Sequence, residues 1–179
     1  GVNKNRRVVD ICCGSGSFLM TAMGKMFKDA NPDEVERIRQ DGLYGVEFDD
    51  ELYTLAVANM IIRKDGKSNV YFGDCFDSRI VRELKAKNIN IGLINPPYSQ
   101  DDVVELEFVE HLLDILAVDG TGVVVVPMSC AIGTKFKDVR KRLFHAACPL
   151  HLISLLCRGD ASITKGRYAV MSFSTFFCP

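Results

Sequence analysis

Four groups of residues with evident chemical potential each follow a short apolar run of the chain. They are Gly14-Ser15-Gly16, Glu47, Asp74 and Asn95-Pro96-Pro97-Tyr98. Glycines between a strand and a helix let a ligand approach the backbone closely, and a helix that begins at Ser17 favours a carboxylate or phosphate there. A carboxylate at a strand end can accept hydrogen bonds from ribose hydroxyls, as expected for Glu47, or from an adenine amino group, as expected for Asp74. The first three groups therefore suit a ligand that contains a nucleoside.

Each of these three groups also has a purely structural interpretation. The glycines can serve a tight strand–helix turn, Glu47 can be a surface acid beside Asp49, and Asp74 can cap the helix that follows it. Phe48 and Cys75 can pack on the faces of an adenine ring, or they can belong to the core. If all the groups fall on one edge of the fold, that edge supports a binding site more strongly than any group alone.

The fourth group, at positions 95–98, is the most informative. Two consecutive prolines fix the backbone and remove two N–H donors, which leaves the Asn95 side-chain oxygen and the Pro96 carbonyl as acceptors. A site rich in acceptors suits a planar NH2 group, and the Tyr98 ring offers a face on which a planar group can stack. The structural alternative is a rigid proline turn with a surface tyrosine, which we disfavour because the string falls on the shared edge.

The elements that must position these residues alternate along the chain. β-branched and apolar runs predict strands at 7–12, 43–47, 69–72, 89–94, 122–126, 150–157 and 168–177. Helical spacing and capping residues predict helices at 18–26, from Asn31, and at 49–63, 78–87, 103–118 and 135–146.

This alternation predicts an α/β fold with a doubly wound, mostly parallel sheet of seven strands. The fully apolar strand at 122–126 is expected to be central. The loop at 158–167 is too short for a helical crossover, so the last two strands should form a C-terminal antiparallel hairpin. Because the carboxyl ends of parallel strands share one edge, all four residue groups should meet in one crevice.

Composition narrows the class of protein. The chain has 179 residues, a net charge of −1 and 47% hydrophobic residues, which excludes a disordered, fibrous or disulfide-stapled chain and indicates one globular domain. Near-neutral charge excludes strong nucleic-acid binding by bulk electrostatics alone. Seven cysteines without a Cys-x-x-Cys pair indicate free thiols in a reducing, cytoplasmic location and no metal site. No apolar stretch is long enough to cross a membrane.

The stretch from Val9 to Phe18, followed by the string at 95–98, resembles the amino methyltransferases that use S-adenosylmethionine. More narrowly, it resembles the N6-adenine DNA methyltransferases and, within them, the modification subunit of type I restriction–modification systems. The segments 44–47 and 73–76 also match, and the resemblance covers nearly the whole chain. Where the family often has Pro after the first Asp, this chain has Ile11.

The resemblance implies a Rossmann-like methyltransferase fold, with residues 1–179 as a single catalytic domain. This domain would be a fragment that lacks the flanking N-terminal helical region and the target-recognition region. It also implies methyl transfer to the N6 amino group of a flipped-out adenine in double-stranded DNA, with DNA contacts mostly outside this chain and with specificity and restriction subunits as partners.

The resemblance also assigns site residues. Asp10 and the glycine loop would hold the methionine end of S-adenosylmethionine, Glu47 its ribose and Asp74 its adenine. The full cofactor-binding set is Asp10, Cys12, Gly14, Ser15, Gly16, Phe18, Glu47, Phe48, Asp74 and Cys75. The catalytic set is Asn95, Pro96, Pro97 and Tyr98, and no metal is expected.

Other functions stay open at this point. A protein glutamine N5-methyltransferase acting on release factors shares the string at 95–98, because a glutamine amide is also a planar NH2. The domain can instead be a cofactor-binding subunit that is inactive without its partners. A nicotinamide oxidoreductase leaves the string unexplained.

The basic residues and histidines have no assigned place in the site. The basic run at 135–142 is expected to be a solvated helix face rather than a phosphate contact. Better candidates for a phosphate contact are Arg158, Lys165 and Arg167. The histidines are not expected to be catalytic.

Overall fold

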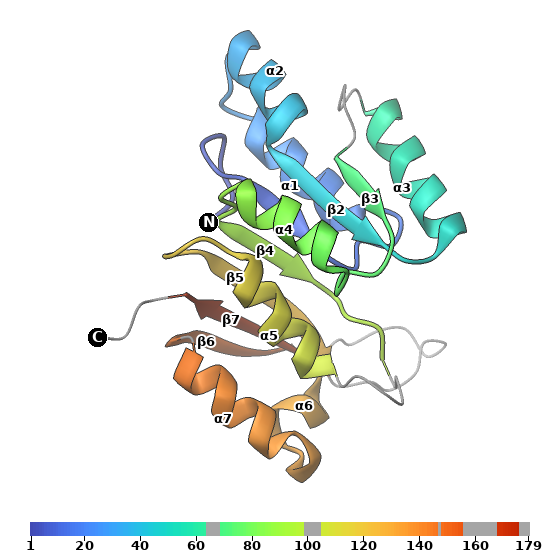
Figure 1. Ribbon diagram of the computed structural model, residues 1–179. Coiled ribbons are helices and arrows are strands. Elements are labelled where there is room, and N and C mark those ends of the chain that lie inside the picture. Colours follow the sequence, from blue (N-terminus) through green and yellow to red (C-terminus); the bar gives the residue numbers. More distant parts are fainter. Residues whose placement is uncertain (64–68, 99–104, 147, 156–167, 176–179) are drawn as a thin grey trace.

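A single seven-stranded sheet organises the chain (Figure 1). The computed structural model describes residues 1–63, 69–98, 105–146, 148–155 and 168–175. In spatial order the sheet runs β3-β2-β1-β4-β5-β7-β6; the first five of these are parallel, and β7 is antiparallel to both of its neighbours. The strands are β1 (Val8–Asp10), β2 (Leu43–Glu47), β3 (Val70–Phe72), β4 (Ile91–Ile94), β5 (Thr121–Pro127), β6 (Cys148–Leu155) and β7 (Tyr168–Ser174). The predicted doubly wound α/β sheet with a terminal antiparallel hairpin is confirmed.

Helices cover both faces of this sheet. One face packs on α1 (Ser17–Phe27), α2 (Pro32–Asp41) and α3 (Asp50–Ile62), whose buried side chains include Leu19, Met23, Met26, Ile38 and Met60. The other face packs on α4 (Ser78–Ala86), α5 (Glu105–Ile115), α6 (Met128–Ile132) and α7 (Lys137–Ala146), which contribute Ile80, Leu84, Leu106, Leu112, Cys130 and Leu143. The two layers bury separate apolar clusters and hold the strands rigidly between them.

Local sequence signals explain where the helices next to the site begin. Asn31 accepts a hydrogen bond from the Glu34 N–H and the Glu34 side chain accepts one from the Asn31 N–H, so α2 starts in a capping box with Pro32 in its first turn. Asp49 caps α3 through the Leu52 N–H at 2.9 Å. The α3 cap lies directly after β2 and therefore sets the path of the chain at the sheet edge.

Two sequence predictions needed correction. The helix predicted at 135–146 is a 3-10 turn (Thr134–Phe136) followed by α7, and the short helix α6 was not predicted. Five residues are too few to show a helical period, and Gly133 ends α6 at once. Strand β5 lies inside the sheet, but β4 is its middle strand. Along β5, buried residues alternate with half-buried ones. The buried Val124 and Val126 pack on the side of the sheet that α5 and α7 cover.

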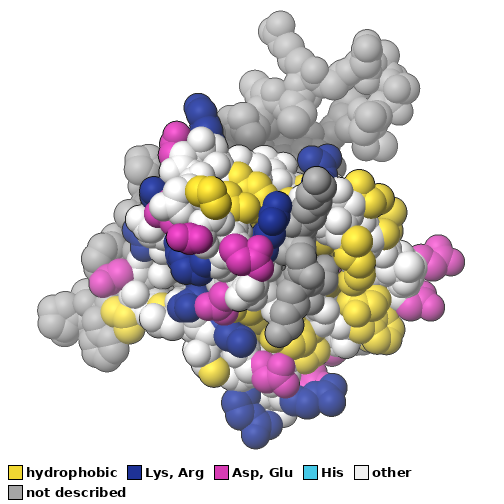
Figure 2. Space-filling model, turned by 90° about the horizontal axis from the view of Figure 1, so that it is seen from above, with side chains coloured by type: hydrophobic (Ala, Val, Ile, Leu, Met, Phe, Trp, Pro, Cys, Tyr) yellow, Lys and Arg dark blue, Asp and Glu magenta, His cyan; other side chains and the backbone are white. Residues whose placement is uncertain are grey.

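The surface viewed from above carries mixed charge (Figure 2). Basic and acidic side chains are interspersed over this face, and hydrophobic side chains gather along one side of it. None of the helices in the described ranges has both the length and the apolar character that a bilayer crossing requires.

Candidate functional site

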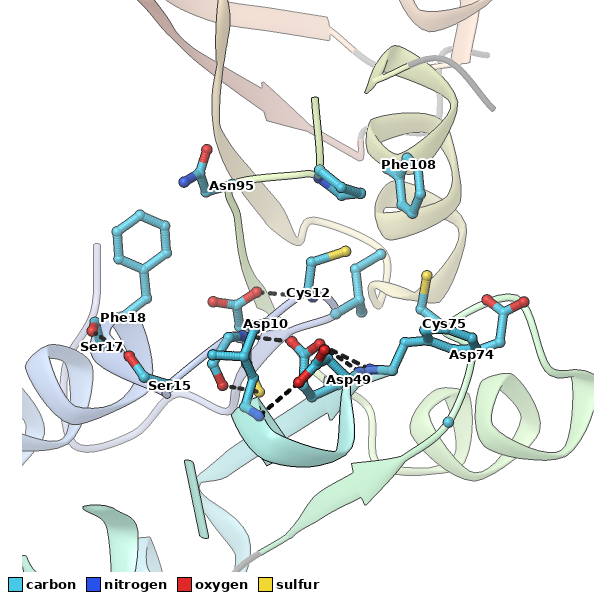
Figure 3. Close-up of a pocket in the computed structure, with 18 of the residues that line it drawn as sticks. Asp10, Cys12, Ser15, Ser17, Phe18, Asp49, Asp74, Cys75, Asn95 and Phe108 are labelled. Atoms are coloured by element: carbon cyan, nitrogen blue, oxygen red, sulfur yellow. Dashed lines mark hydrogen bonds between the residues drawn. The ribbon is translucent and has the colours of Figure 1, made fainter. Parts of the chain in front are cut away.

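A cavity of about 640 Å³ opens at the carboxyl ends of β1, β2, β3 and β4 (Figure 3). Most of the residues selected from sequence line it, namely Asp10, Cys12, Gly14, Ser15, Phe18, Glu47, Phe48, Asp74, Cys75, Asn95 and Pro97. Its volume lies in the range of small-molecule sites, and its position is the usual ligand edge of an open parallel sheet. Tertiary structure therefore brings the four sequence groups, which span more than eighty residues of chain, into one hollow.

The loop between β1 and α1 forms one wall. Gly14 and Gly16 have φ angles of +53° and +82°, a region in which side chains are strained, so glycine is required at both positions. The Ser15 carbonyl is held by the Asn59 amide of α3 at 3.0 Å. Gly16 lies behind the lining, where an added Cβ would stand 3.6 Å from Ala56. The loop is thus clamped against α3 with its backbone towards the cavity.

Glu47 is fixed at the end of β2 by backbone donors. Its Oε2 accepts a hydrogen bond from the Gly14 N–H at 2.7 Å, and its Oε1 accepts from the Phe48 and Asp49 N–H groups, each at 3.0 Å. A carboxylate held by three amides keeps one orientation and still has lone pairs for a ligand hydroxyl. The surface-acid interpretation fails, because this carboxylate ties the glycine loop to β2.

Asp10 is the most buried charged group of the site, with 2% of its surface exposed. Burial raises the pKa of its carboxyl to about 7, and repulsion from Glu47 adds to the rise. A 3.1 Å hydrogen bond from the Cys12 N–H opposes it. This carboxyl can therefore take up or release a proton near neutral pH.

The electrostatic character of the cavity is acidic. Asp10, Glu47, Asp49 and Asp74 line it, and the described lining contains no lysine, arginine or histidine. A cleft lined by one sign of charge concentrates the opposite sign. The site therefore favours a ligand that carries positive charge.

The loop after β3 builds the opposite wall. Gly73 donates its N–H to the Glu47 carbonyl at 2.9 Å, and the Asp74 Oδ1 accepts a hydrogen bond from the Phe76 N–H at 2.9 Å. Helix α4 is capped by Asp77, so Asp74 is not the cap of that helix. Cys75 is buried and Phe48 is 75% exposed, so Phe48 is not a core residue.

The neighbouring cysteines after β1, Cys12 and Cys13, point to opposite faces of the sheet. Cys13 joins the cluster under α1, whereas Cys12 packs on the α4–α7 side and faces the cavity. The Cys12 thiol contacts that of Cys75, and this hydrogen bond together with burial raises its pKa far above the ordinary range. The Cys12 sulfur is therefore an unreactive thiol that shapes the cavity wall.

The string after β4 divides between the cavity and its rim. Asn95 and Pro97 line the cavity, while Pro96 is buried. The Tyr98 hydroxyl donates a hydrogen bond to the Asn95 Oδ1, and Tyr98 does not belong to the described lining. The predicted amine acceptor, the Asn95 Oδ1, is thus bonded to the hydroxyl of Tyr98, whose ring was expected to stack on the substrate.

Sequence reasoning missed several lining residues, notably Asp49, Leu52, Phe76 and Phe108. Asp49 and Phe76 could have been found as near neighbours of Glu47 and Asp74. Phe108 gave no sequence signal for a site, because an apolar residue within a helix is expected simply to pack in the core. In the structure its ring meets Phe76 edge-on, with ring centroids 5.1 Å apart.

The basic run before β6 has internal partners. Arg140 donates to the Cys130 and Gly133 carbonyls at 2.9 and 2.7 Å, and Arg142 pairs with Glu110 at 2.9 Å. The lysines of the run are exposed, as expected for a solvated helix face, whereas the internal bonds of Arg140 were not expected from sequence. The other phosphate candidates, Arg158, Lys165 and Arg167, lie outside the described residues, as do the side chains of His145 and His151.

Comparison with known proteins gives consistent matches. Residues 2–157 match the family described as N-6 DNA Methylase. The chain is 40% identical over 151 residues to the type II restriction enzyme and methyltransferase RM.BcgI of Heyndrickxia coagulans, covering 79% of this chain. It is 25% identical over 171 residues to the type I restriction enzyme EcoEI methylase subunit of Escherichia coli, covering 85% of this chain.

Solved structures share the fold. The crystal structure of the EcoKI M protein, from a type I restriction enzyme, superposes with a TM-score of 0.79 over 98% of this chain and 41% of that one, at 19% identity. The chain spans only 23% of RM.BcgI and 34% of the EcoEI subunit. It therefore corresponds to one portion of those larger proteins.

Proposed function

The chain belongs to the N-6 DNA methylase family, and we propose that it transfers a methyl group from S-adenosylmethionine to the N6 amino group of an adenine in DNA, within a restriction–modification system. The observation that carries the proposal is that Asn95 opens onto the same cavity as Asp10, Glu47 and Asp74. This shared lining supports a methyl-donor site next to an amine-binding site, as group transfer would require. We take residues 1–179 as one catalytic domain of the larger enzyme.

The residues present fit S-adenosylmethionine. This cofactor would supply an electrophilic methyl group on a positively charged sulfur, and the acidic lining suits both that charge and the ammonium group of its methionine end. Asp10 and the backbone of the glycine loop would bind the methionine end. The fixed carboxylate of Glu47 would accept the ribose hydroxyls, and Asp74 would accept the adenine amino group.

Asn95 and its neighbours would bind the target base. A base flipped out of the duplex can enter a site that reads its exocyclic amine. The Asn95 Oδ1 and the Pro96 carbonyl would accept that amine's two hydrogens, which localises the nitrogen lone pair. Tyr98 would leave its bond to Asn95 and stack on the base. Positioning and acceptor electrostatics would carry the rate enhancement, so a strong general base is not required.

The relatives support DNA as the substrate. Both are enzymes of restriction systems, so double-stranded DNA, specificity subunits and restriction subunits are the partners we propose. We place the reaction in the cytoplasm. The free thiols of Cys12, Cys13, Cys75 and Cys130 suit that reducing compartment.

The decisive assay follows transfer of labelled methyl groups from S-adenosylmethionine to duplex DNA, with a glutamine-containing release factor as the competing acceptor. We expect N6-methyladenine in the DNA and none in the product of Asn95→Ala, which should still bind the cofactor. Lys135→Ala, on a residue outside the cavity lining, is the matched control and should keep activity.

Other outcomes of this assay would redirect the assignment. Methylation of the release factor alone would establish a protein glutamine methyltransferase. The chain alone can also bind the cofactor without turnover. If adding the remaining subunits then restores turnover, the chain is a cofactor-binding part that is active only in the complex.

A further inference from the structure

We propose that His111, on helix α5, is a positioning residue that sets the adenine-binding wall of the cavity. The proposal rests on the proposed function, because it concerns the affinity for S-adenosylmethionine. It was not expected from sequence, where His111 had no assigned chemistry. The argument begins with its contacts to the loop that follows β3.

His111 holds the backbone of that loop directly. Its Nε2 lies 2.8 Å from the carbonyl oxygen of Cys75. Because a carbonyl oxygen only accepts hydrogen bonds, the Nε2 must carry a proton and donate it. The bond joins residues 36 positions apart and ties α5 to the loop that carries Asp74, Cys75 and Phe76.

The imidazole also packs on an aromatic cluster of the same wall. The ring of His111 lies 4.4 Å from that of Phe76, with 32° between their planes. Phe76 in turn meets Phe108 edge-on at 5.1 Å. Phe76 and Phe108 both line the cavity, so the contact with His111 supports the aromatic surface that Phe76 presents there.

Other contacts restrain the loop at its start and at Cys75: the Gly73 N–H bonds to the Glu47 carbonyl at 2.9 Å, and the buried Cys75 thiol contacts that of Cys12. Gly73 is the hinge, with a φ of +146° that only glycine adopts readily, and the Phe76 N–H bonds to the adjacent Asp74 carboxylate. Phe76 itself is 38% exposed. Without His111, the Cys75 carbonyl would lose its donor and Phe76 its stacking partner, so Asp74 and Phe76 would sample positions that do not fit an adenine ring.

Substitutions can separate the two contacts. His111→Gln retains a donor at comparable reach and removes the ring, whereas His111→Phe retains the ring and removes the donor. His111→Ala removes both. Asp114→Asn on the same helix is the control, because it breaks the 2.8 Å ion pair with Lys85 on α4 and leaves the loop untouched.

Cofactor affinity is the first readout, measured by calorimetry with S-adenosylmethionine and with methylthioadenosine, which lacks the amino acid group. We expect His111→Ala to weaken both ligands by about tenfold, with His111→Gln and His111→Phe intermediate and Asp114→Asn unchanged. Asp10→Asn should weaken only S-adenosylmethionine. Both ligands contain the adenine end that His111 is proposed to serve, so a loss confined to S-adenosylmethionine in His111→Ala would contradict the proposal.

Amide hydrogen exchange without ligand is the second readout, and it is independent of the proposed function. Exchange at residues 73–76 should become faster in His111→Ala and be partly restored in His111→Gln. If the wild-type chain binds the cofactor, unchanged exchange at residues 73–76 in His111→Ala, or a cofactor affinity of His111→Ala equal to that of wild type, would refute the role of His111. A wild-type chain that binds neither ligand would instead refute the proposed function, and the cofactor role of His111 with it.

Discussion

Asp10 has opposing effects on stability and on binding. Its burial favours the neutral carboxyl, whereas a cationic ligand needs the carboxylate, so the structure holds a group whose ionised form is costly until the ligand arrives. Sites that bind charge commonly sacrifice stability in this way. The protonation of Asp10 can therefore be tested through the stability of the folded chain, without any substrate.

The pH dependence of folding should report on Asp10. Its pKa is about 7 in the folded chain against an ordinary value of 3.8, so the folded state keeps a proton that the unfolded state has lost. Stability should fall as pH rises from about 4 to about 7 and then level off, a loss of up to about 4 kcal/mol. Asp10→Asn should remove most of that slope and unfold at higher urea concentration above neutral pH. Identical pH profiles for the two proteins would contradict this assignment.

Tyr98 provides a second test at the residue scale. Tyr98→Phe removes the hydroxyl that bonds to the Asn95 Oδ1 and keeps the ring, so DNA methylation should stay within a few-fold of wild type. Tyr98→Ala removes the stacking surface and should lower kcat by about ten- to a hundredfold. Steady-state kinetics with duplex DNA would measure both, and the Kd for S-adenosylmethionine should be equal in all three proteins. A larger loss in Tyr98→Phe would show that the hydroxyl itself is needed.

Among the elements, α6 is tied to α7 by the Arg140 side chain. The Arg140 guanidinium donates to the Cys130 and Gly133 carbonyls at the end of α6, where the last carbonyls of a helix have no partner within the helix. Arg142, two residues further along, forms an exposed pair with Glu110. Neighbouring arginines in one basic run thus have different structural importance.

Urea unfolding can distinguish these arginines. Arg140→Ala should lower the free energy of unfolding by about 1–3 kcal/mol, because it leaves two carbonyls of a helix end without a charged donor. Arg142→Ala should cost less than about 1 kcal/mol, since exposed ion pairs contribute little. Equal effects of the two substitutions would mean that the α6 contact does not support the fold.

At the scale of the whole molecule, charge limits what this chain does alone. The net charge is −1, and the face in Figure 2 shows basic and acidic side chains interspersed rather than a basic track. Two arginines of the basic run are already paired within the chain. DNA affinity in the proposed enzyme must therefore come mainly from other regions or subunits.

Fluorescence anisotropy with a labelled duplex can test this conclusion. The chain alone should bind DNA no more tightly than about 10⁻⁴–10⁻⁶ M at physiological salt, the range of non-specific binding. Affinity should rise on addition of the other portions of the enzyme. A nanomolar Kd for the isolated chain would contradict the charge argument and would point to the residues 156–167 and their cations.

The amino-acid sequence by itself determined the strands, most helices and the residues that follow each strand. Strand runs, glycine turns and caps such as Asn31 act within a few residues, so their consequences are local and readable. The edge shared by parallel strands then placed Gly14, Glu47, Asp74 and Asn95 together. The short α6, the 3-10 turn at the start of the helix predicted at 135–146 and the place of β5 were missed or misjudged, because none of them follows from a local pattern.

Tertiary structure alone decided the contacts between distant segments. Nothing local indicates that Phe108 and His111 of α5 stand behind the loop after β3. The high pKa of Asp10 likewise depends on how layers of sheet and helix exclude water around it. Burial and long-range packing are properties of the whole assembled core, so they become fixed only when the elements have come together.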